Sequence, residues 1–104
     1  MRLAILILTL ATLLSACGGG REGLAVDACE RAIAARITDK PFQIDRSAMA
    51  AAATREGEDV IRIQSPIVFD PGLPREETQT VDCRVRFTAD KREPDVIALS
   101  FVWE

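Results

Sequence analysis

The chain of 104 residues has no histidine and no tyrosine, and only three cysteines. The missing histidine removes the side chain that most often acts as a general base near neutral pH and most often binds transition metals. Three cysteines are too few for a zinc cluster once two of them pair. No glycine-rich phosphate loop lies between a predicted strand and a helix. We therefore expect no enzymatic activity, no metal site and no cofactor.

Long hydrophobic runs are also missing. The longest apolar stretch, residues 3–14, is shorter than the about 20 residues that a helix needs to cross a bilayer. It follows Met1 and Arg2, and small residues lead from it to Cys17. A basic start, a short apolar segment and small residues before a cleavage point are typical of a secretory signal peptide.

The tetrapeptide Leu14-Ser15-Ala16-Cys17 resembles the lipobox of bacterial lipoproteins. This resemblance covers residues 1–17 only. It implies a signal peptide over residues 1–16, lipid on the Cys17 sulfur and attachment to a membrane through acyl chains. Gly18 stands where an Asp favours retention in the inner membrane, so the resemblance implies the periplasmic face of the outer membrane, with the inner membrane as the alternative. A secreted protein whose Cys17 merely lies near a cleavage point is the competing interpretation.

The remaining chain has the size of one small domain. Gly18–Gly20 cannot bury side chains, so residues 17–23 are expected to form a flexible tether before a domain over residues 24–104. Without Arg2 the chain carries 12 of its 13 basic residues and all 16 acidic residues, a net charge of −4. A nucleic-acid partner would require an excess of basic residues, so we expect no such partner.

Cys29 and Cys83 form an even pair in a chain that is expected to be exported. Such pairs form disulfides in oxidising compartments. Their long separation differs from the Cys-x-x-Cys spacing of redox sites, which favours a structural bridge.

Hydrophobic periodicity predicts one helix and three strands. Residues 24–37 are expected to be helical, and Lys40-Pro41 ends that helix. Residues 60–69, 78–88 and 96–103 alternate as strands do, with a bulge or a sheet edge expected at Pro66. The residues expected to face the core are Val26, Cys29, Ile33 and Ile37 in the helix, and Ile61, Ile63, Ile67, Phe69, Val81, Cys83, Val85, Phe87, Ile97, Leu99, Phe101 and Trp103 in the strands.

Residues 42–55 leave two alternatives open. The alanine run has high helix propensity, yet a hairpin partner for residues 60–69 is the preferred interpretation. The predicted fold is therefore α+β: an N-terminal helix packed on a four-stranded antiparallel meander, held by one disulfide between Cys29 and Cys83.

Two surfaces are candidates for binding. Arg62, Arg84 and Arg86 alternate with inward residues, so they are expected to form a basic stripe on the open face of the sheet. The alternative is a solvated face on which Asp82 and other acids pair with these arginines. Leu73 lies at the tip of the proline-stiffened loop 70–77, where an ordered loop would lose less entropy on binding. An ordinary hairpin connection is the alternative for this loop.

These features predict a membrane-anchored, non-enzymatic binding or accessory module of the cell envelope. Its partner would be another envelope protein or an anionic envelope surface. The alternatives are a structural or stress-linked envelope lipoprotein without a dedicated ligand, and a small inhibitor of a periplasmic enzyme that inserts the loop 70–77.

We expect the Cys17→Ser substitution to abolish both acylation and cleavage before residue 17, because the serine hydroxyl does not replace the sulfur that receives the lipid. The intact mass of the wild-type protein extracted from membranes should exceed that of the polypeptide 17–104 by the mass of its acyl chains. A mass equal to that of the bare polypeptide would contradict the prediction.

Overall fold

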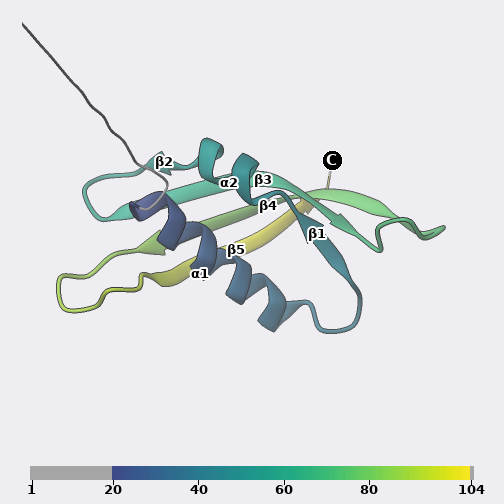
Figure 1. Ribbon diagram of the computed structural model, residues 1–104, viewed down its shortest axis with the longest axis horizontal. Coiled ribbons are helices and arrows are strands. Elements are labelled where there is room, and N and C mark those ends of the chain that lie inside the picture. Colours follow the sequence, from purple (N-terminus) through teal and green to yellow (C-terminus); the bar gives the residue numbers. More distant parts are fainter. Residues whose placement is uncertain (1–19, 104) are drawn as a thin grey trace, which may run out of the picture.

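The computed structural model describes residues 20–103, which form two helices and an antiparallel sheet (Figure 1). This arrangement confirms the α+β class with an N-terminal helix on the sheet. The predicted signal peptide and Cys17 lie outside the described residues. Within residues 20–103, neither helix is long and apolar enough to cross a membrane. The elements are α1 (Arg21–Arg36), β1 (Phe42–Ile44), α2 (Arg46–Ala52), β2 (Thr54–Arg55), β3 (Val60–Phe69), β4 (Glu77–Arg86) and β5 (Asp95–Trp103).

The sheet has four strand positions in the order β1-β3-β4-β5, and β2 shares the first position with β1. β3 pairs with β4 along its whole length. On its other side it pairs with β2 through residues 61–62 and with β1 through residues 67–69. The predicted meander therefore has the right order, but its first position holds two short strands, which makes five strands instead of four.

Residues 42–55 combine the two alternatives that the sequence left open. The alanine-rich centre forms α2, which begins where the Asp45 side chain accepts a hydrogen bond of 3.1 Å from the Ala48 amide. Ala53 then adopts extended geometry, and β2 follows. The fully buried side chain of Met49 fixes α2 to the core. The preferred hairpin is thus present as β2–β3, but it is only two residue pairs long.

Pro66 lies in the part of β3 that has a neighbouring strand on one side only, between the residues paired with β2 and those paired with β1. A proline nitrogen that faces such a gap removes no ladder hydrogen bond. The register with β4 continues without a shift through the pair Pro66 and Thr80. A local sheet edge, one of the two predicted possibilities, therefore accommodates the proline.

α1 lies across the inner face of the sheet and buries one side of its surface. It begins at Arg21, three residues before the predicted start, and ends when Ile37 turns to extended geometry with φ −100° and ψ 91°. The predicted stripe is confirmed, since Val26, Cys29 and Ile33 are at most 2 % exposed. The fully or almost fully buried strand residues opposite are Ile61, Ile63, Ile67, Val81, Cys83 and Val85.

The predicted inward face of β5 is wrong at two residues. Arg84 pairs with Ala98 and Val85 pairs with Val96, so Ile97 is the extra residue of a β-bulge. The bulge reverses the alternation before it, which turns Val96 toward the core and leaves Ile97 45 % exposed. Trp103 is 72 % exposed because it lies beyond Phe101, the last residue of β5 that packs against the core.

The disulfide between Cys29 and Cys83 is present, with an S–S distance of 2.10 Å. It joins the middle of α1 to β4, and both cysteines are completely buried. The sequence prediction of a structural bridge between the helix and the sheet is confirmed.

Replacing both cysteines, Cys29→Ala with Cys83→Ala, should lower the free energy of unfolding by about 4 kcal/mol in the chain-entropy model. The bridge restricts the unfolded chain over a sequence separation of 54 residues. Urea denaturation of the wild type and the double variant at neutral pH measures this difference. A loss of stability below about 0.5 kcal/mol, the size of an ordinary surface substitution, would contradict the structural role.

Candidate binding surfaces

The face of the sheet opposite α1 is not covered by any element of residues 20–103, because both helices pack on the inner face. The three arginines of the predicted stripe come together there. Arg62 on β3 is directly opposite Arg84 on β4, and Arg86 is opposite Val60. Cross-strand neighbours of like charge repel one another, so this pairing requires nearby acids.

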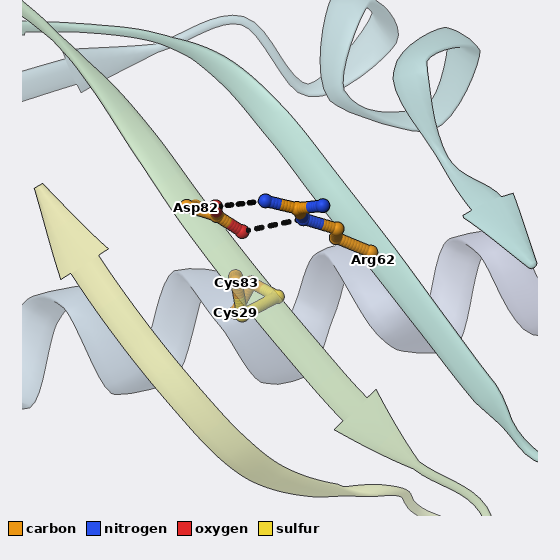
Figure 2. Close-up of a disulfide and its surroundings, with 4 residues drawn as sticks. All are labelled: Cys29, Arg62, Asp82 and Cys83. Atoms are coloured by element: carbon orange, nitrogen blue, oxygen red, sulfur yellow. Dashed lines mark hydrogen bonds and ion pairs between the residues drawn. A yellow bond between two sulfur atoms is a disulfide. The ribbon is translucent and has the colours of Figure 1, made fainter. Parts of the chain in front are cut away.

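Asp82 is the first of these acids. Its carboxylate accepts hydrogen bonds from Arg62 Nε at 3.0 Å and Nη2 at 2.6 Å, and a third from the Gln64 amide at 3.3 Å. Figure 2 shows this ion pair on one side of β4 and the disulfide of Cys29 and Cys83 on the other. The two-pronged geometry is the one in which a guanidinium binds a carboxylate most strongly.

Glu56, in the turn before β3, is the second acid. Its carboxylate lies 2.8 Å from Arg84 Nε and 3.6 Å from Arg62 Nη1. Two arginines and two acids therefore balance one another at the centre of the face. Arg86 is exposed, and it makes no ion pair with the residues that the structure describes.

The predicted basic stripe is thus largely neutralised within the domain, and the alternative of arginines paired with Asp82 describes Arg62 and Arg84. A role of this face in binding stays a prediction. A ligand would meet two arginines whose charges are balanced by Asp82 and Glu56, and one further arginine, Arg86, that is not paired with an acid among residues 20–103. The hydrogen bonds from Arg62 hold the pKa of Asp82 below its ordinary value, and Asp82 in turn raises the pKa of Arg62.

The second candidate surface is the loop between β3 and β4, which is ordered by its own backbone. The Leu73 amide donates to the Asp70 carbonyl at 3.1 Å, and the Glu76 amide donates to the Leu73 carbonyl at 2.9 Å. The Gly72 amide donates to the Glu76 carboxylate at 2.7 Å. Gly72 has φ of +77°, which glycine adopts without strain. These bonds hold Leu73 at the tip, where its side chain is 48 % exposed.

Sequence reasoning identified Asp82 as a possible partner of the arginines but missed Glu56. Alternation along one strand places Asp82 on the same face as Arg84, which is a local signal. Glu56 reaches that face only because the turn of residues 56–59 closes the short β2–β3 hairpin, and nothing in the sequence pattern indicates this. The sequence also gave no sign that Arg46 of α2 binds Asp27 and Glu30 of α1.

No group of three or more potential metal-binding side chains occurs among residues 20–103. Comparison with protein-family models, with curated proteins and with solved structures found no match to this chain.

The Asp82→Asn substitution should destabilise the protein at neutral pH, because it removes the carboxylate that Arg62 binds. A carboxylate whose pKa is lowered by folding stabilises the fold above its unfolded pKa, and this contribution is lost as the pH falls through the lowered value. The difference in urea midpoint between wild type and variant should therefore shrink below about pH 4.

The matched control for this experiment is Asp39→Asn, which changes an exposed aspartate that forms no ion pair with residues 20–103. This substitution should leave the urea midpoint almost unchanged both at neutral pH and below about pH 4. A difference between wild type and Asp82→Asn that does not depend on pH would contradict the prediction.

Proposed function

We propose that this protein is a lipid-anchored lipoprotein of the bacterial envelope that serves as a non-enzymatic binding or accessory module for another envelope protein. The anchor is Cys17, the location is the periplasmic face of the outer membrane, and the partner is bound at the end of the domain that lies farthest from the membrane. The proposal rests on the lipobox resemblance combined with the position at which α1 begins.

The observation that carries the proposal is the start of α1 at Arg21, only four residues after Cys17. Four extended residues span at most about 14 Å. A lipid on Cys17 would therefore hold the start of α1 close to the bilayer, instead of letting the domain move on a long tether.

The start of α1 lies at one end of the sheet. Arg21 donates a 2.7 Å hydrogen bond to the Glu58 carbonyl in the β2–β3 turn, and its guanidinium lies 4.6 Å from the centre of the Phe87 ring beyond β4. The β3–β4 loop with Leu73 projects from the opposite end (Figure 1). Ten residues of strand separate the two ends by about 30 Å.

This separation favours the β3–β4 loop as the contact with a partner. The loop combines an ordered backbone with an exposed leucine, so it presents apolar surface without a large entropy loss on binding. Because α1 begins close to the lipid anchor and the β3–β4 loop lies at the opposite end of the sheet, this loop would point away from the membrane.

Photo-crosslinking in intact envelopes tests the proposal. A photoreactive amino acid at Arg75, an exposed loop residue, should give one reproducible protein adduct, whereas the same group at Asp90, in the loop at the anchored end, should not. Leu73→Ser should lower the yield of the adduct about tenfold, because burial of a leucine contributes about 1.5–3 kcal/mol. Leu73→Met, which keeps the apolar volume, is the control and should retain the adduct.

The identity of the adduct distinguishes the remaining alternatives. An envelope protein without catalytic activity supports the proposal. A periplasmic enzyme that loses activity on binding indicates the inhibitor alternative. The absence of a reproducible adduct from Arg75 would contradict the proposal and leave a structural lipoprotein without a dedicated ligand.

A further inference from the structure

Exposed apolar side chains of the described chain are concentrated on one strand. Ile97, Val102 and Trp103 are 45 %, 52 % and 72 % exposed, and all three belong to β5. The only other large hydrophobic residue among residues 20–103 with comparable exposure is Leu73. In addition, residues 96–103 contain no ionisable side chain. A strand with exposed apolar side chains and no charge is a site at which another strand can pair.

The two edges of the sheet differ sharply. The edge formed by β1 and β2 consists of strands of three and two residues, interrupted by α2. β5 is nine residues long, and among residues 20–103 it pairs with β4 alone. Short and interrupted edges resist further pairing, whereas a long, uncharged edge offers a row of unpaired backbone groups to another strand.

One side chain already occupies part of this edge. Arg36 Nη1 donates a 2.9 Å hydrogen bond to the Leu99 carbonyl. In an antiparallel strand, the N–H and C=O groups of one residue point to the same side and alternate along the chain. Leu99 and Phe101 therefore direct their backbone groups away from β4, and Arg36 stands where the N–H of a neighbouring strand would donate.

A groove runs beside the same edge. It has a volume of about 400 Å³ and lies between α1 and β5, with Ala32 and Ala35 on one wall and Ile97 and Ala98 on the other. α1 passes over β5 in the view of Figure 1, and Arg36, its last residue, reaches this edge at the Leu99 carbonyl. Because the alanines are small, an extended chain beside β5 could place an apolar side chain under this part of α1.

We infer that the edge of β5 binds an extended segment of a partner protein as an added strand, with an apolar side chain in the α1–β5 groove and a carboxylate on Arg36. When the incoming N–H takes over the Leu99 carbonyl, Arg36 is released, and its guanidinium is free to bind the carboxylate. This interaction surface goes beyond the proposed function, because it requires neither the anchor nor the β3–β4 loop.

Charge decides between this occupant and a second copy of the chain. Arg36 forms no ion pair with an acid among residues 20–103, so the site favours a strand that carries a carboxylate. A second β5 would bring Asp95, whose carboxylate is already bound by Lys91 at 2.6 Å, and Glu104, which follows the strand. Each lies at least four residues from Leu99, the residue whose carbonyl Arg36 binds. The observations therefore favour an acidic extended segment over a second β5.

The test uses the full protein in detergent and a capped octapeptide of alternating threonine and valine, with one threonine replaced by glutamate. Trp103 is the only tryptophan of the chain, so its fluorescence reports directly on β5. Addition of the peptide should shift the Trp103 emission to shorter wavelength and protect the Leu99 and Phe101 amides from hydrogen exchange. The same peptide N-methylated at every residue should bind at least about tenfold more weakly, because it cannot donate to the strand edge.

Two variants separate the parts of the site. The wild type should bind the glutamate peptide about fivefold more tightly than the same peptide with glutamine in place of glutamate. Arg36→Ala should remove this difference in affinity. Ile97→Lys should abolish binding by placing a charge in the groove, while Ala51→Lys, at an exposed residue of α2 away from β5, should leave binding unchanged.

Several results would overturn the inference. The first is that the N-methylated peptide binds as tightly as the unmethylated one. The second is that the Trp103 fluorescence does not change at millimolar peptide. The third is that the unliganded protein sediments as a dimer and that Ile97→Lys dissociates this dimer. The last result would assign the edge to a second copy. A loss of binding in Ile97→Lys counts only if its circular dichroism and urea midpoint match those of Ala51→Lys.

Discussion

The disulfide between Cys29 and Cys83 fixes α1 against β4, and the arrangement of both faces of the sheet depends on this contact. It holds α1 over the inner residues of β3 and β4, where the buried side chains of the core lie. A chain of this size buries a smaller fraction of its surface than a larger domain does, so a covalent link between helix and sheet contributes a large share of its stability.

Because both helices pack on the inner face, the outer face of the sheet is exposed to water. Arg62 and Arg84 are opposite one another on that face, and Asp82 and Glu56 compensate their charges. The result is a structured but nearly neutral surface. The exposed large apolar side chains lie at the periphery instead, at Leu73 in the β3–β4 loop and along β5, and these are the places where a partner would gain most from contact.

The parts of the fold that could be predicted from the sequence are those with long, regular patterns. The stripe of α1, the alternation of β3 and β4 and the pairing of Cys29 with Cys83 follow from periodicity and from cysteine usage. β1 and β2 are too short to show a period, so α2 between them could not be distinguished from a strand. The bulge at Ile97 reverses an alternation that otherwise looks regular, and only the register with β4 reveals it.

The candidate binding surfaces follow the same division. The outward direction of Arg62, Arg84 and Arg86 is a local property of their strands, and the exposure of Leu73 follows from its place in a proline-rich turn. The neutralisation by Glu56 and the bond from Arg36 to the Leu99 carbonyl join segments 28 and 63 residues apart. Contacts of this range depend on the tertiary structure, which a single sequence does not display.

The inference that depends most on the fold is that the edge of β5 is open in the free protein. Hydrogen exchange of the β5 amides, measured residue by residue by NMR on the purified protein, distinguishes an open edge from a covered one. At an open edge, Ser100 and Val102, whose amides face β4, should exchange slowly, while Leu99 and Phe101 should exchange rapidly. Uniformly slow exchange along β5 would show that the edge is already covered and that no further strand can pair there.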